Sequence, residues 1–351
     1  MNIVYGVSGE GLGHVFEAKE IIARLRKAGH HVKVLTYGER ALASLGEFGP
    51  TRIEGIHLYF NSKGMSLGDT VRRNLRCIPF YLLNWRRLRR ELVAFQPDVF
   101  LTAYEPFSMV ASHLLGKPLI SMDNQNELLH LAPPGGTNLF SFLLARSATA
   151  VCTQGAAFYI VKSFGIRRRS SARVRFVSPV IQQEIRKLEP RRGSHIFVYL
   201  TKPNPELESI MRSMDETFVV YCNNRVGNEG NLSYRAQGGS YLRDLADCKA
   251  IIATTGFSLI ADSIFLKKPY FGVPLKGQFE QTHNARFLAL SGLGEYSEEL
   301  SRGAIEAFLV KIPIFEARLG RHHLDPSEQE ETLLRILREI EEGPSSQPAV
   351  I

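Results

Sequence analysis

Residues 254–284, TTGFSLIADSIFLKKPYFGVPLKGQFEQTHN, constrain the fold of this chain more than any other stretch. They follow a buried apolar strand at 250–253 and predict a helix over 258–266. A strand over 270–273 and a second helix from about residue 279 come next. Because parallel strands end at a common edge of their sheet, two consecutive strand-to-helix units present their loops together. The stretch therefore predicts an α/β fold with a ligand site at that edge.

The loops of this stretch carry groups that suit both phosphate and hydroxyls. The turn at 254–258 opens a helix, where backbone N–H groups and the positive end of the helix dipole favour a phosphate. Glu280, Gln281 and Asn284 add hydrogen-bond donors and acceptors one loop later. Phosphate on one side and hydroxyls on the other is what a nucleotide sugar offers, so a nucleotide-sugar site is predicted.

The composition predicts a two-domain globular protein. A chain of 351 residues with 44% hydrophobic and 22% charged residues is long enough for two ordinary domains. Its cysteines, at 77, 152, 222 and 248, form no CxxC pair, which indicates reduced thiols. The chain opens directly on a strand pattern, and no apolar run reaches the length of a membrane-spanning helix. We therefore expect a cytoplasmic protein that can also sit on the inner face of the membrane.

The net charge of +8 is concentrated in one region. Residues 71–90 contain seven arginines and no acid, and apolar residues such as Phe80, Trp85 and Leu88 lie between them. The pattern is typical of an interfacial helix on anionic lipid, but a core-facing helix with a solvated basic face has the same hydrophobic stripe. Peripheral membrane contact is one prediction and a solvated face the other. No recognition motif supports nucleic-acid binding.

The N-terminal region predicts a first βαβ unit. A strand at 3–7 precedes the glycine-rich loop 8–14, and apolar residues at helical spacing follow up to Gly29. The next strand is expected at 31–36. The glycines do not match GxGxxG, and no acid closes the second strand, so a dinucleotide site is not predicted. The glycine-rich loop is instead predicted to bring its backbone close to a ligand.

Further strands extend this pattern into two similar halves. In the first half we expect strands at 51–56, 99–102, 119–122, 148–153 and 174–177. Residues 178–193 predict a linker, and strands at 196–200, 218–221 and 250–253 begin the second series, with a polar loop at 223–239. The prediction is two doubly wound Rossmann-like domains that face a central cleft, at 1–180 and 190–325. A helix at 326–343 is expected to pack back on the N-terminal domain, and residues 343–351 to form a loose end.

Five segments carry a resemblance to a known family: VSGEGLGH at 7–14, AYEPF at 103–107, SMDNQ at 121–125, TTGFSLIAD at 254–262 and VPLKGQFEQTHNA at 273–285. They resemble the GT-B glycosyltransferases. Within these, the chain is similar to the UDP-glycosyltransferase-like branch that has a GEGxGH loop and includes the bacterial GlcNAc transferase of lipid II synthesis. The last segment is the most specific, and the resemblance covers most of the chain.

The resemblance implies that the C-terminal domain binds a UDP-linked sugar. The diphosphate would lie on the turn after the strand at 250–253, with Asp262 at the ribose and Glu280 and Gln281 at the sugar. The residues expected at the diphosphate are Thr201, Thr255, Gly256, Phe257 and Ser258. Plainer interpretations exist, since Asp262 could be an exposed helix residue and Glu280 a first-turn acid that the helix dipole favours.

The resemblance also implies an acceptor site in the N-terminal domain. His14 would be the general base of an inverting transfer, and Glu105 a reserve base or a ligand of the acceptor hydroxyl. The alternative for His14 is a helix-capping or core histidine. Gly11, Gly13, Asp123 and Asn124 belong to loops on the acceptor side. The acceptor is expected to be a glycan or a lipid-linked molecule.

No DxD motif and no His, Cys and Asp cluster with metal spacing occurs, so a metal-independent transfer without a cofactor is predicted. Two alternatives stay open. One is a non-hydrolysing nucleotide-sugar 2-epimerase on the same fold. The other is a non-catalytic nucleotide-sugar binding protein, because Ala103, Thr255 and Asp262 replace the Asp, Gly and Glu that are usual in the family.

Overall fold

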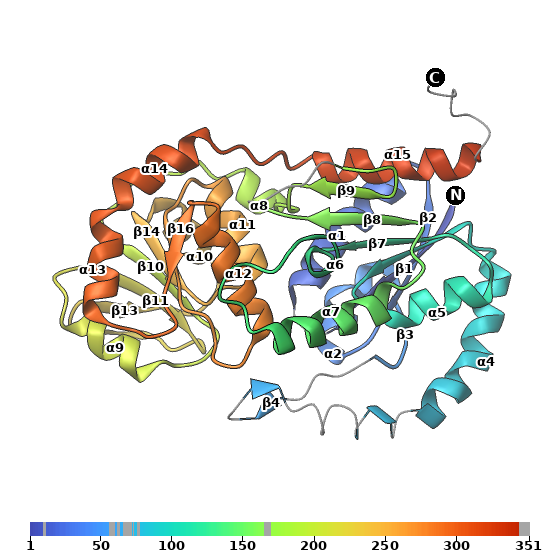
Figure 1. The fold of residues 1–351 in the computed structure, drawn as a ribbon, viewed down its shortest axis with the longest axis horizontal. Helices are drawn as coiled ribbons and strands as arrows, with labels where there is room; N and C mark the ends of the chain where they lie inside the picture. The colour runs from blue at the N-terminus through green and yellow to red at the C-terminus, as the bar shows by residue number, and fades with distance from the viewer. Residues whose placement is uncertain are drawn as a thin grey trace.

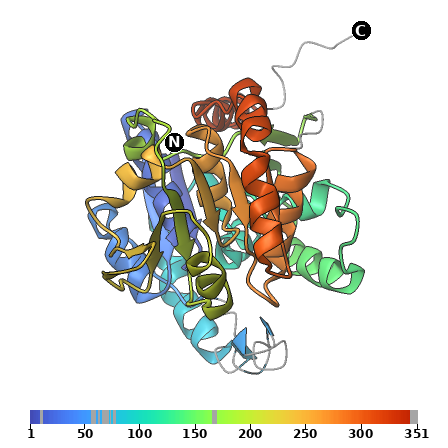
Figure 2. The same cartoon turned by 90° about the vertical axis from the view of Figure 1, so that its left-hand side faces the viewer.

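The computed structural model describes residues 1–9, 12–55, 60–61, 64–65, 72, 74–75, 78–164 and 170–343. Two α/β units lie side by side, each built around a sheet of seven described strands (Figure 1). Figure 2 looks from the end of the second unit, with the first unit behind it. The predicted α/β architecture of two Rossmann-like sheets is confirmed.

The first sheet is parallel throughout, in the order β3-β2-β1-β6-β7-β8-β9. Strand β1 (Asn2–Val7) packs on both faces, since Ile3, Tyr5 and Val7 join one apolar cluster and Val4 joins another. This is why the strand is a continuous apolar run. The strands are β1 (Asn2–Val7), β2 (His31–Thr36), β3 (Thr51–Arg52), β6 (Val99–Ala103), β7 (Leu119–Asp123), β8 (Phe158–Lys162) and β9 (Val174–Val177).

Helices cover both faces of this sheet. Helix α1 (Leu12–Lys27) packs on one face through Val15 and Ile22, and α4 (Ile78–Phe95) packs on the other through Leu88 and Leu92. The remaining elements of the first unit are α2 (Glu39–Ser44), the 3-10 turn η1 (Gly46–Phe48), the short antiparallel pair β4 (Phe60–Asn61) and β5 (Gly64–Met65), α5 (Pro106–Leu114), α6 (Glu127–His130) and α7 (Leu139–Thr153).

The second sheet repeats this topology in the order β12-β13-β11-β10-β14-β15-β16, with only the β12–β13 pair antiparallel. Its strands are β10 (Ile196–Leu200), β11 (Phe218–Cys222), β12 (Gly227–Glu229), β13 (Leu232–Tyr234), β14 (Ala250–Ala253), β15 (Tyr270–Gly272) and β16 (Gly294–Tyr296). Its helices are α9 (Pro205–Arg212), α10 (Tyr241–Asp247), α11 (Phe257–Phe265), α12 (Phe279–Leu290), α13 (Arg302–Val310) and α14 (Ile312–Arg321).

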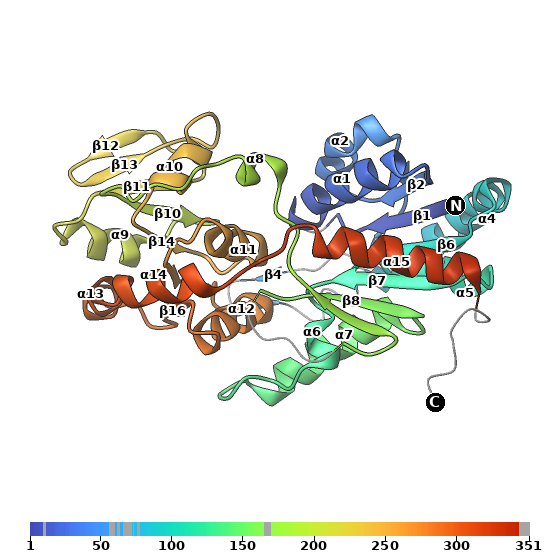
Figure 3. The ribbon, with the colours of Figure 1, turned by 90° about the horizontal axis from the view of Figure 1, so that it is seen from above.

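Two segments connect the units. Helix α8 (Gln183–Arg186) lies on the path from β9 to β10, and α15 (Glu328–Glu342) returns along the first unit, as Figure 3 shows. Leu333, Ile336 and Leu337 of α15 join the apolar cluster of the first sheet. Arg24 of α1 donates to Glu330 over 2.5 Å, so the amphipathic tail packs on the domain that begins the chain.

One predicted strand is wrong. Residues 148–153 form the last turns of α7, where Thr149, Cys152 and Thr153 are buried at helical spacing. The hydroxyls of Thr149 and Thr153 donate to carbonyls four residues earlier, at 3.0 and 2.9 Å, which lets these β-branched residues stay in a helix. The strand of this region is β8, which follows the helix. The polar loop predicted at 223–239 likewise contains β12 and β13.

No helix within the described ranges has the length and apolar character to cross a membrane. Several positions of the arginine-rich stretch and residues 344–351 of the predicted loose end lie outside the described residues.

Candidate active site

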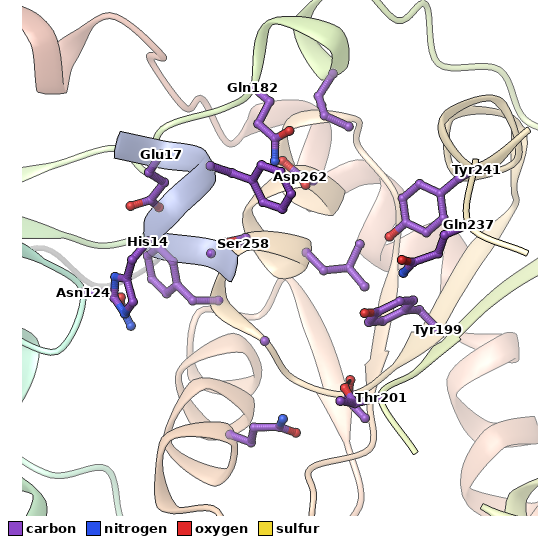
Figure 4. Close-up of a pocket in the computed structure, with 18 of the residues that line it drawn as sticks. His14, Glu17, Asn124, Gln182, Tyr199, Thr201, Gln237, Tyr241, Ser258 and Asp262 are labelled. Carbon is purple, nitrogen blue, oxygen red and sulfur yellow. Dashed lines mark hydrogen bonds between the residues drawn. The ribbon is translucent and has the colours of Figure 1, made fainter. Parts of the chain in front are cut away.

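A cavity of about 640 Å³ lies between the two units (Figure 4). The order of the parallel strands in each sheet reverses at one point, between β1 and β6 in the first sheet and between β10 and β14 in the second. Ligands of doubly wound sheets bind at such points, outside the carboxyl ends of the strands. Loops from both points line the cavity. The residues that were predicted and line it are Gly13, His14, Asn124, Thr201, Gly256, Phe257, Ser258, Asp262, Glu280 and Gln281.

The start of α11 forms the wall contributed by the second unit. Gly256 is the N-cap residue, and within the described chain no side chain caps the helix. A Cβ added to Gly256 would meet no described atom within 4 Å. The first backbone N–H groups of α11 are therefore open to the cavity, where they and the helix dipole favour an anion.

Thr255 lies behind this wall, where its hydrogen bonds hold the loop between β14 and α11 in place. It is fully buried, and its hydroxyl donates to the carbonyl of Gln281 over 2.7 Å. Asn284 donates from Nδ2 to the carbonyl of Thr255 over 3.1 Å, and the side chain of Gln281 accepts from the N–H of Leu275 over 3.0 Å. Thr255 thus ties the start of α11 to the start of α12 and does not line the cavity.

Asp262 projects from α11 into the cavity and is only partly buried. None of the described residues forms a hydrogen bond with its carboxylate. Burial, followed by the nearby charge of Glu17, raises the pKa of Asp262 to about 7. A carboxyl group that is close to half ionised at neutral pH, and that has no hydrogen-bond partner among the described residues, is ready to accept hydrogen bonds from a ligand.

The far end of the cavity has residues that the sequence did not single out. Tyr199, Gln237 and Tyr241 lie there, away from His14 (Figure 4). The ring of Tyr241 meets those of Phe197 and Tyr221 edge-on, with centroids 5.3 and 4.9 Å apart. The available signal was the position of Tyr199 near the end of β10, but an aromatic residue on a strand is more often part of the core.

His14 forms the wall contributed by the first unit. Its Nδ1 lies 3.8 Å from Oδ2 of Asp123, and its ring stacks at 6.4 Å on that of Tyr104. Burial lowers the pKa of His14, and Lys162 lowers it further, whereas Glu17 and Glu280 act in the opposite direction. The histidine is therefore neutral at pH 7 and can accept a proton.

Asp123, at the end of β7, is fully buried. Its Oδ2 accepts no hydrogen bond from the part of the chain that the structure describes. Burial raises the pKa of Asp123 to about 6, and the positive charge of Lys162 opposes this rise. Asp123 does not line the cavity itself, but it faces the histidine that does.

Glu105 does not reach the cavity, contrary to its predicted place beside the acceptor. Its carboxylate caps α5, because Oε1 accepts from the N–H of Phe107 over 2.6 Å and Oε2 accepts from the N–H and hydroxyl of Ser108 over 2.8 and 2.6 Å. A Cβ on Gly6 would lie 2.4 Å from Oε2, so that glycine makes room for the cap. The structure gives Glu105 a helix-capping role.

The two units meet across the cavity. A Cβ on Gly13 would come 3.2 Å from the hydroxyl of Ser258. Oε1 of Glu280 accepts from Nδ2 of Asn124 over 3.4 Å and from Nε2 of Gln125 over 3.3 Å. The acidic residue predicted to hold a sugar thus lies against the loop after β7. Gly11 is outside the described residues. Among the described residues, no group of three or more His, Cys, Asp or Glu side chains could hold a metal ion.

Comparison with known proteins gives the family. The model of the family described as glycosyl transferase family 1 matches residues 1–313. The chain belongs to glycosyl transferase family 1. The predicted enzyme class, a glycosyltransferase, is thereby confirmed. A search of the curated proteins found no match.

Solved structures show the fold of this glycosyltransferase. The glycotransferase of kitacinnamycin is similar with a TM-score of 0.68 at 14% identity, over 96% of this chain and 98% of the other. The spinosyn rhamnosyltransferase SpnG, complexed with thymidine diphosphate, has a TM-score of 0.62 at 14% identity, over 97% and 100%. SsfS6 from Streptomyces sp. SF2575, also complexed with thymidine diphosphate, has a TM-score of 0.63 at 14% identity, over 97% and 99%. These likenesses confirm the predicted GT-B fold.

Proposed function

We propose that this glycosyltransferase moves a sugar from a nucleoside-diphosphate sugar to a hydroxyl group of a glycan or lipid-linked acceptor, with inversion and without a metal ion. The observation that carries the proposal is the cavity that joins the open start of α11, on the second unit, to His14 on the first. Asp123 lies behind the histidine, 3.8 Å from its Nδ1. One domain holds the donor and the other the acceptor, so the reacting groups meet between them.

The donor lies along the second unit. Its diphosphate lies beside Gly256 and takes the N–H groups of Phe257 and Ser258, because the N–H of Gly256 already donates to the carbonyl of Thr254 over 2.9 Å. The ribose hydroxyls take Asp262, and the sugar lies toward Glu280 and Gln281. Tyr199, Gln237 and Tyr241 receive the nucleobase at the far end of the cavity. The thymidine diphosphate in SpnG and SsfS6 supports a pyrimidine nucleotide, a class that includes the uridine nucleotide that the family resemblance implies.

The chemistry follows from the position of His14. The acceptor oxygen attacks the anomeric carbon from the face opposite the diphosphate, and its proton passes to His14. As the new C–O bond forms, the bond from the anomeric carbon to the diphosphate oxygen breaks. The start of α11 stabilises the negative charge on the leaving diphosphate. Asp123, 3.8 Å from Nδ1, stabilises the imidazolium that forms.

The donor class can be tested directly with the unmodified protein. A thermal-shift panel of UDP, dTDP, GDP, CMP and their sugars should show a rise in Tm with a pyrimidine nucleoside diphosphate and its sugars, because a ligand that binds only the folded state stabilises it. A rise with GDP and none with UDP or dTDP would contradict the proposed nucleobase. No rise with any of them would contradict the donor site.

Asp262 makes donor binding depend on pH. Its pKa of about 7 means that it becomes ionised between pH 6 and 8, and the ionised form accepts ribose hydroxyls more strongly. The affinity for a nucleotide sugar, whose phosphates do not titrate in this range, should rise by up to about 10-fold from pH 6 to pH 8. Calorimetry on Asp262→Asn should show roughly 10- to 100-fold weaker binding at pH 8 and no such rise.

Asp262→Asn should bind the donor more weakly, but the ligand-free variant should be more stable than the wild type at pH 8. A raised carboxyl pKa in the folded state means that the ligand-free protein loses stability as pH rises from about 4 to about 7. Asp262→Asn removes this loss, so its Tm at pH 8 should exceed that of the wild type while it binds the donor less tightly. A variant with unchanged donor affinity would place the ribose elsewhere.

The proposal also includes peripheral contact with a membrane through helix α4. Arg86, Arg87, Arg89 and Arg90 are exposed on this helix, which suits an anionic surface. Replacing all four by Gln should abolish flotation of the protein with anionic liposomes. Unchanged flotation, or none by the wild type, would leave only the solvated-face interpretation.

A further inference from the structure

A buried ion pair lies beside the proposed catalytic histidine. Glu17 is three residues after His14 on α1, so the two side chains share a face of the helix, and Figure 4 shows them on the same side. Lys162, at the end of β8, donates from Nζ to Oε2 of Glu17. Lys162 is 1% exposed and Glu17 is 8% exposed. Burying a lysine and a glutamate is costly, so a pair placed here calls for an explanation.

The groups that face His14 come from five elements. Glu17 lies on its own helix, Asp123 ends β7, Lys162 ends β8, Tyr104 follows β6, and Glu280 begins α12. Glu280 is exposed and accepts from the two neighbouring amides. Two carboxylates and one ammonium therefore form the buried part, which carries one net negative charge while His14 is neutral. A proton on His14 brings it to neutrality.

Of the two buried carboxylates, only that of Glu17 pairs with Lys162. Strands β7 and β8 are neighbours, so Lys162 and Asp123 project from adjacent strand ends. Yet Lys162 donates to Glu17, and Oδ2 of Asp123 accepts from none of the described residues and faces Nδ1 of His14. The ammonium group of Lys162 is thus paired with Glu17, and Asp123 faces the histidine.

We propose that the Glu17–Lys162 pair is a positioning unit that keeps Asp123 available to His14. The inference rests on the proposed function, in which His14 is the base. The electrostatics agree with it, because Lys162 counters the rise in the pKa of Asp123 that burial causes, and Glu17 counters the fall in the pKa of His14. Lys162 thus favours an ionised Asp123, and Glu17 limits the effect of that lysine on the histidine.

The test is Glu17→Gln, with the pKa of His14 followed by NMR of isotope-labelled histidine. The His14 resonance is assigned by its loss in His14→Ala. With Glu17 gone, Lys162 turns to Asp123, so the pKa of His14 should fall by about one unit. The acidic limb of the kcat profile should move with it to lower pH. We expect kcat to drop by about 10-fold at pH 7 with donor KM within about two-fold.

Two further variants serve as controls for the change in the pKa of His14. Glu20→Gln removes another acid from the same helix and should leave the pKa of His14 unchanged. The double variant Glu17→Gln, Lys162→Met removes both charges, so Asp123 faces His14 again, and the pKa of His14 should rise above that of the single variant. A folded Glu17→Gln protein with the wild-type His14 pKa overturns the inference, even if kcat falls. Full activity of His14→Ala would instead overturn the proposed base, which the NMR titration does not measure.

Discussion

His14→Ala is expected to lower kcat for sugar transfer by about 100- to 10,000-fold, the usual contribution of a positioned general base. Donor affinity should stay within about two-fold, because the proposed donor contacts lie on the second unit. The loss should remove the acidic limb of the kcat profile, since that limb reports the protonation of His14. Steady-state kinetics on variants of equal Tm would measure it.

The control for this prediction is His31→Ala, an exposed histidine on β2 that is remote from the cavity. It should keep wild-type kinetics. Asp123→Asn should lower kcat as well, because the amide cannot stabilise the imidazolium. If His14→Ala retained wild-type kcat, another group would have to accept the proton, and Glu105 would be a poor candidate because its carboxylate caps α5.

Gly256→Ala is expected to weaken the binding of the nucleoside diphosphate by about 10- to 100-fold, which corresponds to about 1.4–2.8 kcal/mol. The added methyl group meets no described atom within 4 Å, so it would occupy the open space where the diphosphate should approach the first N–H groups of α11. The backbone of Gly256, at φ −69 and ψ 136, is accessible to alanine. The stability cost should therefore be below about 1 kcal/mol, from the poorer N-cap.

Gly320→Ala supplies the matched control, because a Cβ there also meets no described atom within 4 Å, on α14 away from the cavity. Calorimetry should give wild-type affinity for that variant. Wild-type affinity in Gly256→Ala would show that the diphosphate does not lie at the start of α11.

The regular part of the fold could be predicted because its signals are local. Strands β1, β10 and β14 are short continuous apolar runs, and glycine or small polar residues follow them. Sequence signals fail where residues adopt a secondary structure that their type disfavours, or where an element is too short to show a pattern. Helix α7 ends in threonines that bond to their own helix, and β12 and β13 are three residues each, too short for an alternating pattern.

The site could be predicted only in part, because only some of its signals are local in the sequence. Loops after strands are visible in the sequence, so ten of the predicted residues line one cavity. Whether a polar residue faces the ligand or supports the loop depends on contacts distant in sequence. Thr255 is held by Gln281, 26 residues further along the chain, and Lys162 pairs with Glu17 across 145 residues. Glu105 had a local signal that was missed, since an acid before a proline is typical of a helix start.

The central claim is transfer of a sugar across the cavity, and NMR of the reaction product tests it most directly. The wild-type protein would be incubated with the nucleotide sugar that stabilises it and with acceptor extracts. We expect the sugar on an acceptor oxygen, with the anomeric configuration opposite to that of the donor. A 2-epimer formed from the donor alone would contradict transfer and favour the epimerase. Donor binding with neither transfer nor hydrolysis in any extract would favour a binding protein.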